Sequence, residues 1–213
     1  GTSGVKAVVA DAHDRVVAQA GAPLAISRPQ PLWAEQDPED WWQAVTTALD
    51  ALAAEAPRAM AAMQAIGLSG QMLGVALLDA ADRPIRPALL WNDTRPAQAP
   101  KDLIAEVGAE DYAQRTGLVP VASFTATKVR WLRDNEPENA ARVEAVVLPH
   151  DWLIWRLRGY GPEGESVNGP RLEELVTDRS DASGTGYWNP TTGRYDRELV
   201  ELALGHPAIL PRV

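Results

Sequence analysis

The chain opens with a turn of small and hydroxyl-bearing residues, Gly1-Thr2-Ser3-Gly4, directly before a β-branched run. In a tight turn of this composition, backbone N–H groups converge on an anion, and the hydroxyls of Thr2 and Ser3 add further donors. Lys6 brings a cation close to the same place. This combination is suited to holding phosphoryl oxygens. The alternative is a plain hairpin turn or a vector remnant, because short Gly/Ser motifs have many false positives.

An acidic pair, Asp178 and Asp181, stands near the carboxyl end of the chain. Paired carboxylates can transfer protons or bind a metal ion. A turn held by local Asx-type hydrogen bonds explains the same pattern. The three histidines, His13, His150 and His206, are scattered beside loop or cap signals and lack metal-ligand spacing. We therefore assign no metal to them.

Net charge and residue usage exclude several classes of protein. The 213 residues carry a formal net charge of −9, which repels phosphate backbones, so no nucleic acid partner is expected. The absence of cysteine excludes disulfide frameworks, thiol catalysis and zinc ribbons, and it is compatible with a reducing compartment. No apolar stretch approaches the roughly 20 residues that span a bilayer, so no membrane partner is expected.

The first quarter of the chain predicts a hairpin followed by a helix. Two β-branched runs, Val5 to Asp11 and Arg15 to Ala20, flank a short polar link and indicate the hairpin. Pro23 to Trp33 contains three prolines and should be irregular. Asp37 is a suitable N-cap, and Pro38 suits the first helical position. The apolar residues that follow share one helical face and should enter the core: Trp41, Trp42, Val45, Ala48, Leu49 and Leu52.

Strands and helices alternate over the rest of the chain. The pattern predicts strands at Met63–Ser69, Val75–Asp79, Ile85–Trp91 and Val143–Leu148, with the middle two as a pair. It predicts helices at Ala97–Val107, Ala126–Asn135, Asp151–Arg158 and Arg197–Leu204. Gly159–Pro170 is rich in Gly and Pro and should be a loop. This order favours an α/β domain with a mixed sheet and helices packed on it.

Five motifs occur in a fixed order along the chain. The first three are Pro31–Trp42 (PLWAEQDPEDWW), Gly67–Gly74 (GLSGQMLG) and Pro87–Arg95 (PALLWNDTR), and Gly117–Trp131 and Thr177–Thr185 follow them. Together, at this spacing, they resemble the amino-terminal half of xylulokinases, a group within the FGGY family of carbohydrate kinases. Each motif alone is modest, but five in register are specific, and they cover nearly the whole chain.

The resemblance implies a ribonuclease-H-like domain of the actin-like ATPase type. Residues 1–213 would be the first of two domains, with the active site in the cleft between them. A carboxylate that organises metal and phosphates would stand immediately before Gly1, and the catalytic Asp would lie in the second domain. No residue of this chain is therefore expected to be catalytic, and the chain alone is expected to be inactive.

The resemblance also implies ligand contacts for two segments. Thr2, Ser3 and Lys6 would contact the phosphates of ATP beside a bound Mg²⁺. After Gln71, the residues Met72 and Leu73 would touch the sugar. The second of these positions is commonly His in xylulokinases, whereas Leu73 offers no hydrogen bond to a sugar hydroxyl. Core packing is the alternative for Met72 and Leu73.

Three further residues are candidates for the sugar pocket. Asn92 and Asp93 can hydrogen-bond sugar hydroxyls, with Trp91 as a wall, although capping of the next helix explains them equally well. Phe124 lies where the family places pocket residues, and core packing is the stronger interpretation for it. Arg95 can contact a ligand or pair with a carboxylate, and pairing at the surface is the common arrangement for an Arg.

The leading hypothesis is a cytoplasmic kinase that uses ATP to phosphorylate D-xylulose to D-xylulose 5-phosphate, with this chain as the sugar-binding half. Leu73 supports an alternative within the same family, a kinase for another ketose or polyol. The carboxylates missing from the chain support an alternative of another class, a non-catalytic sugar-binding or regulatory fragment. A sugar and a nucleotide are the expected partners, and a homodimer is a further hypothesis.

Overall fold

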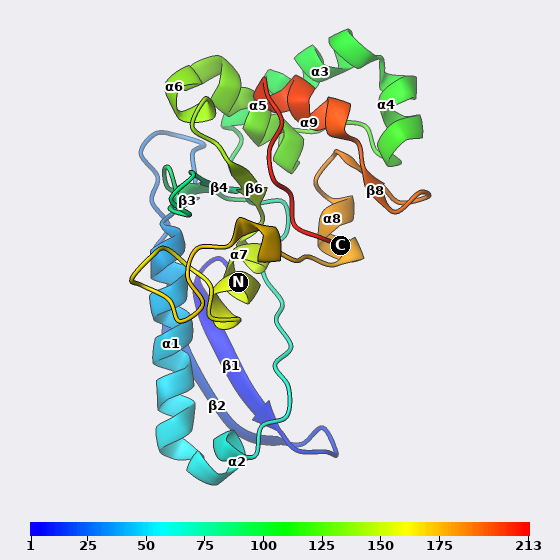
Figure 1. Cartoon of the computed structure of the whole chain (residues 1–213). Coiled ribbons are helices and arrows are strands. Elements are labelled where there is room, and N and C mark those ends of the chain that lie inside the picture. Colours follow the sequence, from blue (N-terminus) through cyan, green and yellow to red (C-terminus); the bar gives the residue numbers. More distant parts are fainter.

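Short strands form a central layer with helices on both sides in the computed structural model, which describes residues 1–213 (Figure 1). The α-helices are α1 (Pro38–Glu55), α2 (Pro57–Ala61), α3 (Ala99–Val107), α4 (Ala109–Thr116), α5 (Thr125–Asn135), α6 (Pro137–Ala140), α7 (Pro149–Leu157), α8 (Arg179–Ser183) and α9 (Arg197–Leu204). Two 3₁₀ turns are η1 (Arg95–Ala97) and η2 (Leu172–Glu174). The strands are β1 (Gly4–Ala10), β2 (Val16–Pro23), β3 (Glu35–Gln36), β4 (Ala76–Leu78), β5 (Ala88–Leu89), β6 (Ala145–Val147), β7 (Trp188–Asn189) and β8 (Arg194–Tyr195).

The strands pair antiparallel as β1–β2, β3–β5, β4–β6 and β7–β8. Single bridges extend the central pairs into one layer. Val75, just before β4, exchanges hydrogen bonds with Leu89 of β5, and Ala145 of β6 is bridged in parallel to Ile209. The layer therefore mixes antiparallel and parallel neighbours, and the predicted α/β class with a mixed sheet is confirmed. The two middle strands were predicted as one pair, and they are joined by the Val75–Leu89 bridge and by a hydrogen bond from Ile85 N to Leu77 O at 2.9 Å. The longer ladders of β4 and β5 are formed with β6 and β3.

Alternate residues of the β4 region face opposite groups of helices. Val75 and Leu77 belong to a buried cluster with residues of α3, α4, α5 and α9. Ala76 and Leu78 belong to a second cluster with α1 and α7. Successive side chains of a strand point to opposite faces, and here the side chains on both faces are apolar. Such a strand is covered by helices on both faces. The polar ends of these strands are thus the places where side chains can meet ligands.

The predicted hairpin and first helix are confirmed. Asp11 Oδ1 accepts hydrogen bonds from the N–H groups of His13 and Arg15 at 2.8 and 3.1 Å, which closes the turn between β1 and β2. Asp37 Oδ1 accepts from Glu39 N at 2.9 Å as the N-cap of α1, with Pro38 directly behind it. On the predicted apolar face, Trp41, Val45, Ala48 and Leu52 are buried, whereas Trp42 and Leu49 are half-buried.

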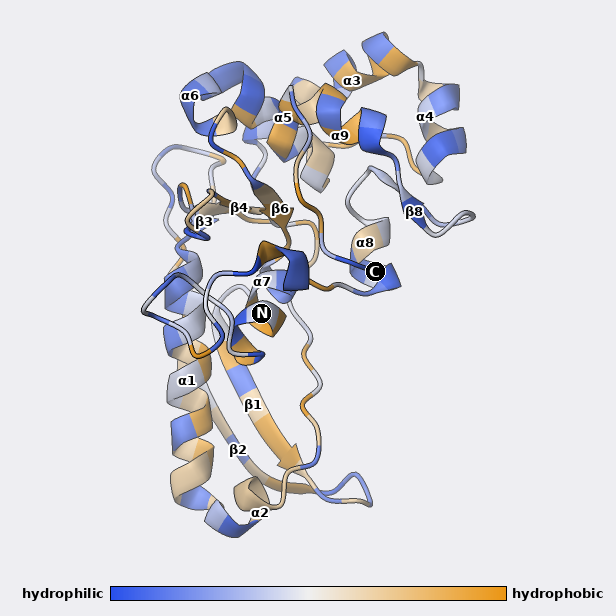
Figure 2. Cartoon of the chain, in the orientation of Figure 1, coloured by the Kyte–Doolittle hydropathy of each residue, from blue (hydrophilic) through white to orange (hydrophobic).

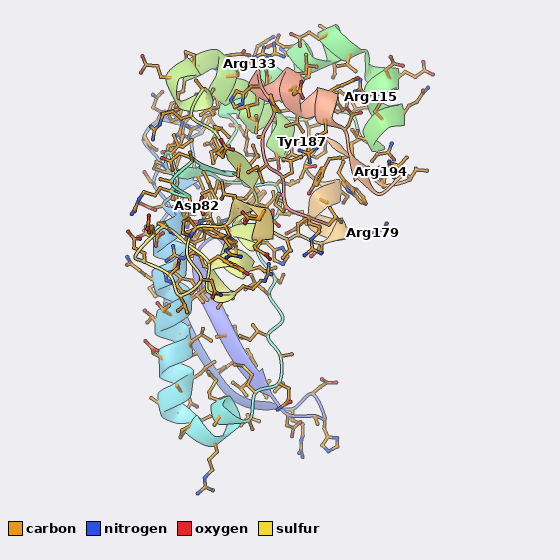
Figure 3. The ribbon with its side chains drawn as sticks, in the orientation of Figure 1. Asp82, Arg115, Arg133, Arg179, Tyr187 and Arg194 are labelled. Carbon is orange, nitrogen blue, oxygen red and sulfur yellow. The ribbon has the colours of Figure 1, made fainter.

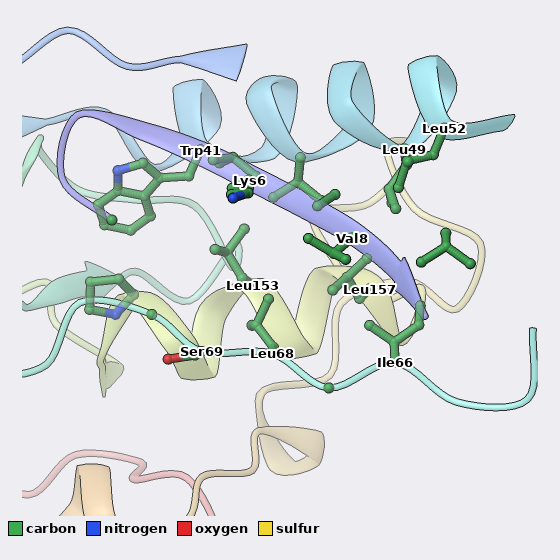
Figure 4. A pocket seen from close by; sticks show the side chains of 18 of the residues that line it. Lys6, Val8, Trp41, Leu49, Leu52, Ile66, Leu68, Ser69, Leu153 and Leu157 are labelled. Carbon is green, nitrogen blue, oxygen red and sulfur yellow. The ribbon is translucent and has the colours of Figure 1, made fainter. Parts of the chain in front are cut away.

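The strand predicted at Met63–Ser69 is wrong. Residues 64–71 make no backbone–backbone hydrogen bond. The segment instead lines an apolar cavity of about 390 Å³, whose other walls are β1, α1 and α7 (Figure 4). Side chains such as Ile66 and Leu68 line this cavity together with Val8 of β1. The apolar residues that predicted a strand therefore pack their side chains around the cavity, and the backbone of this segment does not pair with a strand.

The other predicted elements are confirmed with small shifts at their ends, as α3, α5, β6, α7 and α9, and residues 159–170 contain no helix or strand. Four short helices, α2, α4, α6 and α8, and the β7–β8 pair had not been predicted. In Figure 2, α4 and α6 are largely hydrophilic, in keeping with their place at the outside of the helical layer. Tyr187, in the turn before β7, is buried in the cluster with α4 and α5 (Figure 3). No helix combines the length and apolar character that crossing a bilayer requires.

Candidate functional site

The opening turn has free hydrogen-bond donors. Thr2 and Ser3 form a turn before β1, and no hydrogen bond in the structure uses their N–H groups. The Thr2 hydroxyl accepts a hydrogen bond from Trp91 Nε1 at 3.3 Å, and Ser3 is exposed. Unpaired N–H groups in a turn are what an anion requires. Lys6 lies further along β1, opposite Gly21, and its side chain borders the apolar cavity (Figure 4).

Gln36 of β3 connects the opening turn to the segment after Gly70. Its side chain, which is 2% exposed, donates from Nε2 to Thr2 O at 2.7 Å. Its Oε1 accepts from Trp41 Nε1 at 2.9 Å and from Gln71 Nε2 at 3.3 Å. One buried amide thus fixes the candidate phosphate turn and the candidate sugar segment relative to each other. Sequence reasoning missed this role, because the groups that Gln36 joins are 34 and 35 residues away.

Leu73 has a strained backbone at the centre of a tight turn. Its φ is +65°, and Gly74 N donates to Met72 O at 2.8 Å, which closes a γ-turn around it. Left-handed conformations of this kind are uncommon for residues other than glycine and tend to cluster at functional sites. The Leu73 side chain packs on Gly184, where an added Cβ would lie 2.6 Å from Leu73 Cδ2. Met72 is 56% exposed and therefore free to meet a ligand.

Asp93 is buried and fully engaged within the chain. Its Oδ2 accepts from Ala34 N at 2.7 Å and pairs with Arg95 Nη2 at 2.7 Å, while Oδ1 accepts from Arg95 N at 3.0 Å. Both oxygens thus have protein partners. Asn92 differs, because its buried Oδ1 has no hydrogen-bond partner. Trp91 is 46% exposed beside the opening turn, so it can act as the wall of a ligand site.

Arg95 pairs with carboxylates as predicted, but in the interior and not at the surface. Its side chain is 1% exposed, and its Nη1 lies 2.7 Å from Glu35 Oε1. The guanidinium also stacks 3.6 Å above the Trp33 ring. Burial is tolerated because two carboxylates neutralise the cation and the aromatic face covers it. This buried network fixes the end of β5, from which Trp91 and Asn92 extend.

Phe124 precedes α5 and is held by the first turn of that helix. Thr127 Oγ1 donates to Phe124 O at 2.7 Å, and the buried Lys128 donates to Ser123 O. Burial lowers the pKa of Lys128 to about 7. Phe124 also lies beside Gly186, two residues after the Gly184 that contacts Leu73. The structure therefore brings Leu73 and Phe124 to the same stretch of chain, residues 184–186.

His150 stands at the centre of an acidic cluster that sequence reasoning did not foresee. It is buried in the first turn of α7, with Asp181 Oδ2 3.1 Å from Nδ1 and Asp178 Oδ2 3.9 Å from Nε2. The nearby carboxylates of Asp151 and then Asp181 raise its pKa to about 10. Burial raises the pKa of Asp151. The sequence does not show these carboxylate neighbours of His150, because only folding brings α7 and α8 together.

The candidate residues thus form a connected arrangement. Thr2, Gln71 and Trp91 are joined by hydrogen bonds through Gln36 or directly. No hydrogen bond ties the side chain of Lys6 or Ser3 to this group. Apolar side chains supply most of the lining of the cavity in Figure 4, which therefore offers few partners for a polar ligand. The polar contacts around Gln36 are the better candidate for ligand binding.

Comparison with known proteins identifies relatives over the full chain. Residues 1–213 match the family model described as the FGGY family of carbohydrate kinases, N-terminal domain. A xylulose kinase of Streptomyces coelicolor is 45% identical over 214 residues, covering 100% of this chain and 40% of that kinase. A glycerol kinase of Ralstonia pickettii is 35% identical, covering 100% of this chain and 41% of that enzyme.

Solved structures show the same relationship in three dimensions. The crystal structure of a kinase from Brucella ovis, described as a xyloylose kinase, matches with a TM-score of 0.86 and 39% identity, covering 100% of this chain and 40% of that one. The xylulose kinase of Bifidobacterium adolescentis matches with a TM-score of 0.82 and 33% identity, covering 100% of this chain and 45% of that one. The chain spans about 40% of the length of the curated relatives that it matches in full. This chain belongs to the FGGY family of carbohydrate kinases, in which it matches the N-terminal domain.

Proposed function

We propose that this chain is the sugar-binding half of a kinase that transfers a phosphoryl group from ATP to D-xylulose, giving D-xylulose 5-phosphate. The observation that carries the proposal is the Gln36 amide, which bonds to Thr2 of the opening turn and to Gln71 of the sugar segment. A kinase must hold a phosphate and an accepting hydroxyl side by side, because phosphoryl transfer depends on positioning and charge neutralisation. The names of the relatives, xylulose kinases at 45% identity among them, support D-xylulose.

The residues of this chain would act on both substrates. The free N–H groups of Thr2 and Ser3 would donate to phosphate oxygens, and Lys6 would add positive charge nearby. Met72 and Trp91, both exposed, would cover the sugar, while Gln71, Asn92 and Phe124 would orient its hydroxyls and carbon chain.

Mg²⁺, when bound, would neutralise charge between phosphate oxygens and keep most of its water ligands. The hydroxyl and N–H groups of the turn suit a nucleotide that carries this ion. Asp93 would not touch the sugar. It would hold the backbone beside the site in place through its hydrogen bonds with Arg95 and with the N–H of Ala34.

A coupled assay of ADP release tests the proposal. The product of the complete reading frame that encodes this chain is expected to turn over D-xylulose with a higher kcat/KM than other ketoses and polyols. The variant Gln71→Leu should lower kcat/KM for the sugar roughly tenfold, as expected for one lost hydrogen bond. The exposed Gln43→Leu on α1 is the matched control and should leave turnover unchanged. No ADP release with any sugar would refute the kinase assignment.

A kinase for another ketose or polyol is the second candidate, and Leu73 favours it. The Leu73 side chain packs on Gly184 and presents no polar group to a sugar. The glycerol kinase relative, 35% identical over this whole chain, is a second reason to test polyols. Higher kcat/KM for another sugar in the same panel would establish this candidate in place of D-xylulose.

Two lesser features of the proposal concern setting and assembly. We place the activity in the cytoplasm, where ATP is the available donor, and the lack of cysteine is compatible with that setting. A homodimer stays a prediction, to be measured by light scattering. Sugar binding without turnover by the complete protein would support the non-catalytic alternative.

A further inference from the structure

We propose that His150 is a positioning residue that holds the sugar segment, residues 67–74, in place as a doubly protonated imidazolium between that segment and α8. The proposal rests on the proposed function, since it takes Gln71 and Met72 of this segment as sugar-binding residues. His150 itself touches no candidate ligand atom, and its effect on the sugar is exerted through the backbone of this segment.

The two ring nitrogens of His150 have different oxygen neighbours: Nε2 forms a hydrogen bond with a carbonyl, whereas Nδ1 lies at ion-pair distance from a carboxylate without a hydrogen bond. Nε2 lies 3.2 Å from Leu68 O, a carbonyl oxygen without a proton to give, so Nε2 must be the donor. Nδ1 lies 3.1 Å from Asp181 Oδ2 and 3.7 Å from Asp151 Oδ1. A neutral imidazole protonates only one nitrogen and would leave a lone pair facing an oxygen. The geometry therefore favours the imidazolium.

The same residue is in close steric contact with the sugar segment. A Cβ on Gly70 would lie 3.1 Å from His150 Cβ and 3.2 Å from its Cα, so only glycine fits here without displacement. A Cβ on Gly74 would lie 3.0 Å from Cγ of Pro149, the neighbour of His150. The start of α7 thus supports both ends of the strained turn at Leu73. Residues 64–71 have no backbone partner of their own, so this support must come from side chains.

The charges around His150 come from every element packed against it. Asp151 lies on α7, and Asp178 and Asp181 lie on α8, while the sugar segment contributes only the Leu68 carbonyl. Three carboxylates facing one imidazole need a cation among them to avoid repulsion. The imidazolium supplies it and at the same time binds Leu68 O, so it joins α8 to the sugar segment.

His150, Asp178 and Asp181 also have the chemistry of metal ligands, with ligand atoms within 4.8 Å of one another. A metal ion on His150 needs a ring nitrogen without a proton. It would therefore have to give up either the Leu68 hydrogen bond or the Asp181 ion pair. The proposal makes these two states distinguishable, because the imidazolium has two N–H groups and a metal-bound ring has one.

Side-chain ¹⁵N NMR of this chain, recorded with EDTA between pH 6.5 and 8.5, tests the protonation state. Both His150 ring nitrogens are expected at imidazolium shifts throughout this range. A neutral-ring pattern, or a change in the His150 signals on adding Zn²⁺ or Mn²⁺ after EDTA is removed, would overturn the proposal. The NMR measurement needs no kinase activity, so its result does not depend on whether the proposed function is correct.

Variants test the positioning role. In the complete protein, His150→Gln should raise KM for the sugar roughly tenfold or more, with KM for ATP unchanged. His150→Lys keeps a cation with several donors and should restore part of the loss. His206→Gln is the matched control, because His206 bonds to Ala140 O away from the site. Amide hydrogen exchange at residues 71–74 should accelerate in His150→Gln, and unchanged exchange together with unchanged sugar KM would refute the positioning role.

Discussion

Two buried basic groups, His150 and Lys128, make opposite contributions to the pH dependence of the free energy of unfolding. Carboxylates raise the pKa of His150 to about 10, above its ordinary value of 6.5. Burial lowers the pKa of Lys128 to about 7, below its ordinary value of 10.5. The folded and unfolded states therefore bind different numbers of protons between these values.

The two signs are opposite. Between pH 6.5 and about 10 the folded chain holds an extra proton on His150, so this contribution is complete below pH 6.5 and is lost as the pH rises. Between pH about 7 and 10.5 the unfolded chain holds an extra proton on Lys128, so stability grows as the pH rises. Each slope is about 1.4 kcal/mol per pH unit. From pH 7 to 10 the two slopes cancel, and the wild-type free energy of unfolding should be nearly flat.

Single variants remove one slope and reveal the other. Urea unfolding at pH 7.5, 8.5 and 9.5 should show His150→Gln gaining about 3 kcal/mol over this range, because only the Lys128 slope remains. Lys128→Met should lose about 3 kcal/mol over the same range, because only the His150 slope remains. The double variant should be flat again. The quantity that matters is the slope with pH, since each variant also shifts stability by a constant amount.

Two outcomes would refute this reasoning. A His150→Gln variant as flat as the wild type would mean that His150 is neutral in the folded chain. A Lys128→Met variant parallel to the wild type would mean that Lys128 keeps its proton when buried. Arg133→Gln is a useful control, because arginine side chains do not titrate in this pH range and the replacement should therefore change no slope.

Three other predictions follow from particular contacts. Gly184→Ala should destabilise the chain by about 1–3 kcal/mol, because its Cβ would lie 2.6 Å from Leu73 Cδ2, and adding Leu73→Ala should recover part of the loss in a urea melt. Asp93→Asn should cost about 3–5 kcal/mol in the same assay, because it leaves buried Arg95 with one carboxylate partner fewer. Amides of residues 64–71 should exchange faster than those of β1 in hydrogen-exchange mass spectrometry, and equal protection would contradict their lack of backbone partners.

Elements whose signals are local could be predicted from the sequence. The α1 start follows from Asp37 and Pro38, and the hairpin follows from two β-branched runs on either side of a short link. The Met63–Ser69 strand could not be judged in this way, because an extended apolar segment is compatible both with backbone pairing and with packing against a cavity. Only the position of β1 relative to α7 decides between the two, and that depends on contacts far apart in the chain.

In the candidate site, too, individual residues could be predicted from the sequence, but the contacts between distant residues could not. Thr2, Gln71 and Trp91 were identified from the sequence, yet Thr2 and Gln71 are joined only through Gln36, which had not been singled out as functional. Trp91 bonds to Thr2 directly. The acidic residue Asp93 was predicted to contact sugar or to cap a helix. Its partner Ala34 N is 59 residues away, so the sequence could not show that its oxygens were already used.

Strain at Leu73 connects these observations. A non-glycine residue at φ +65° costs on the order of 1–3 kcal/mol and persists only where the surroundings determine it from several sides. Here Gln36 forms a hydrogen bond with Gln71. Pro149 and His150 pack against Gly74 and Gly70, and the Leu73 side chain packs on Gly184. These supports come from β3, α7 and the end of α8. The conformation of the sugar segment is therefore set by the assembled domain and not by its own sequence. This explains why a substitution at His150, which touches no ligand, is expected to alter sugar binding.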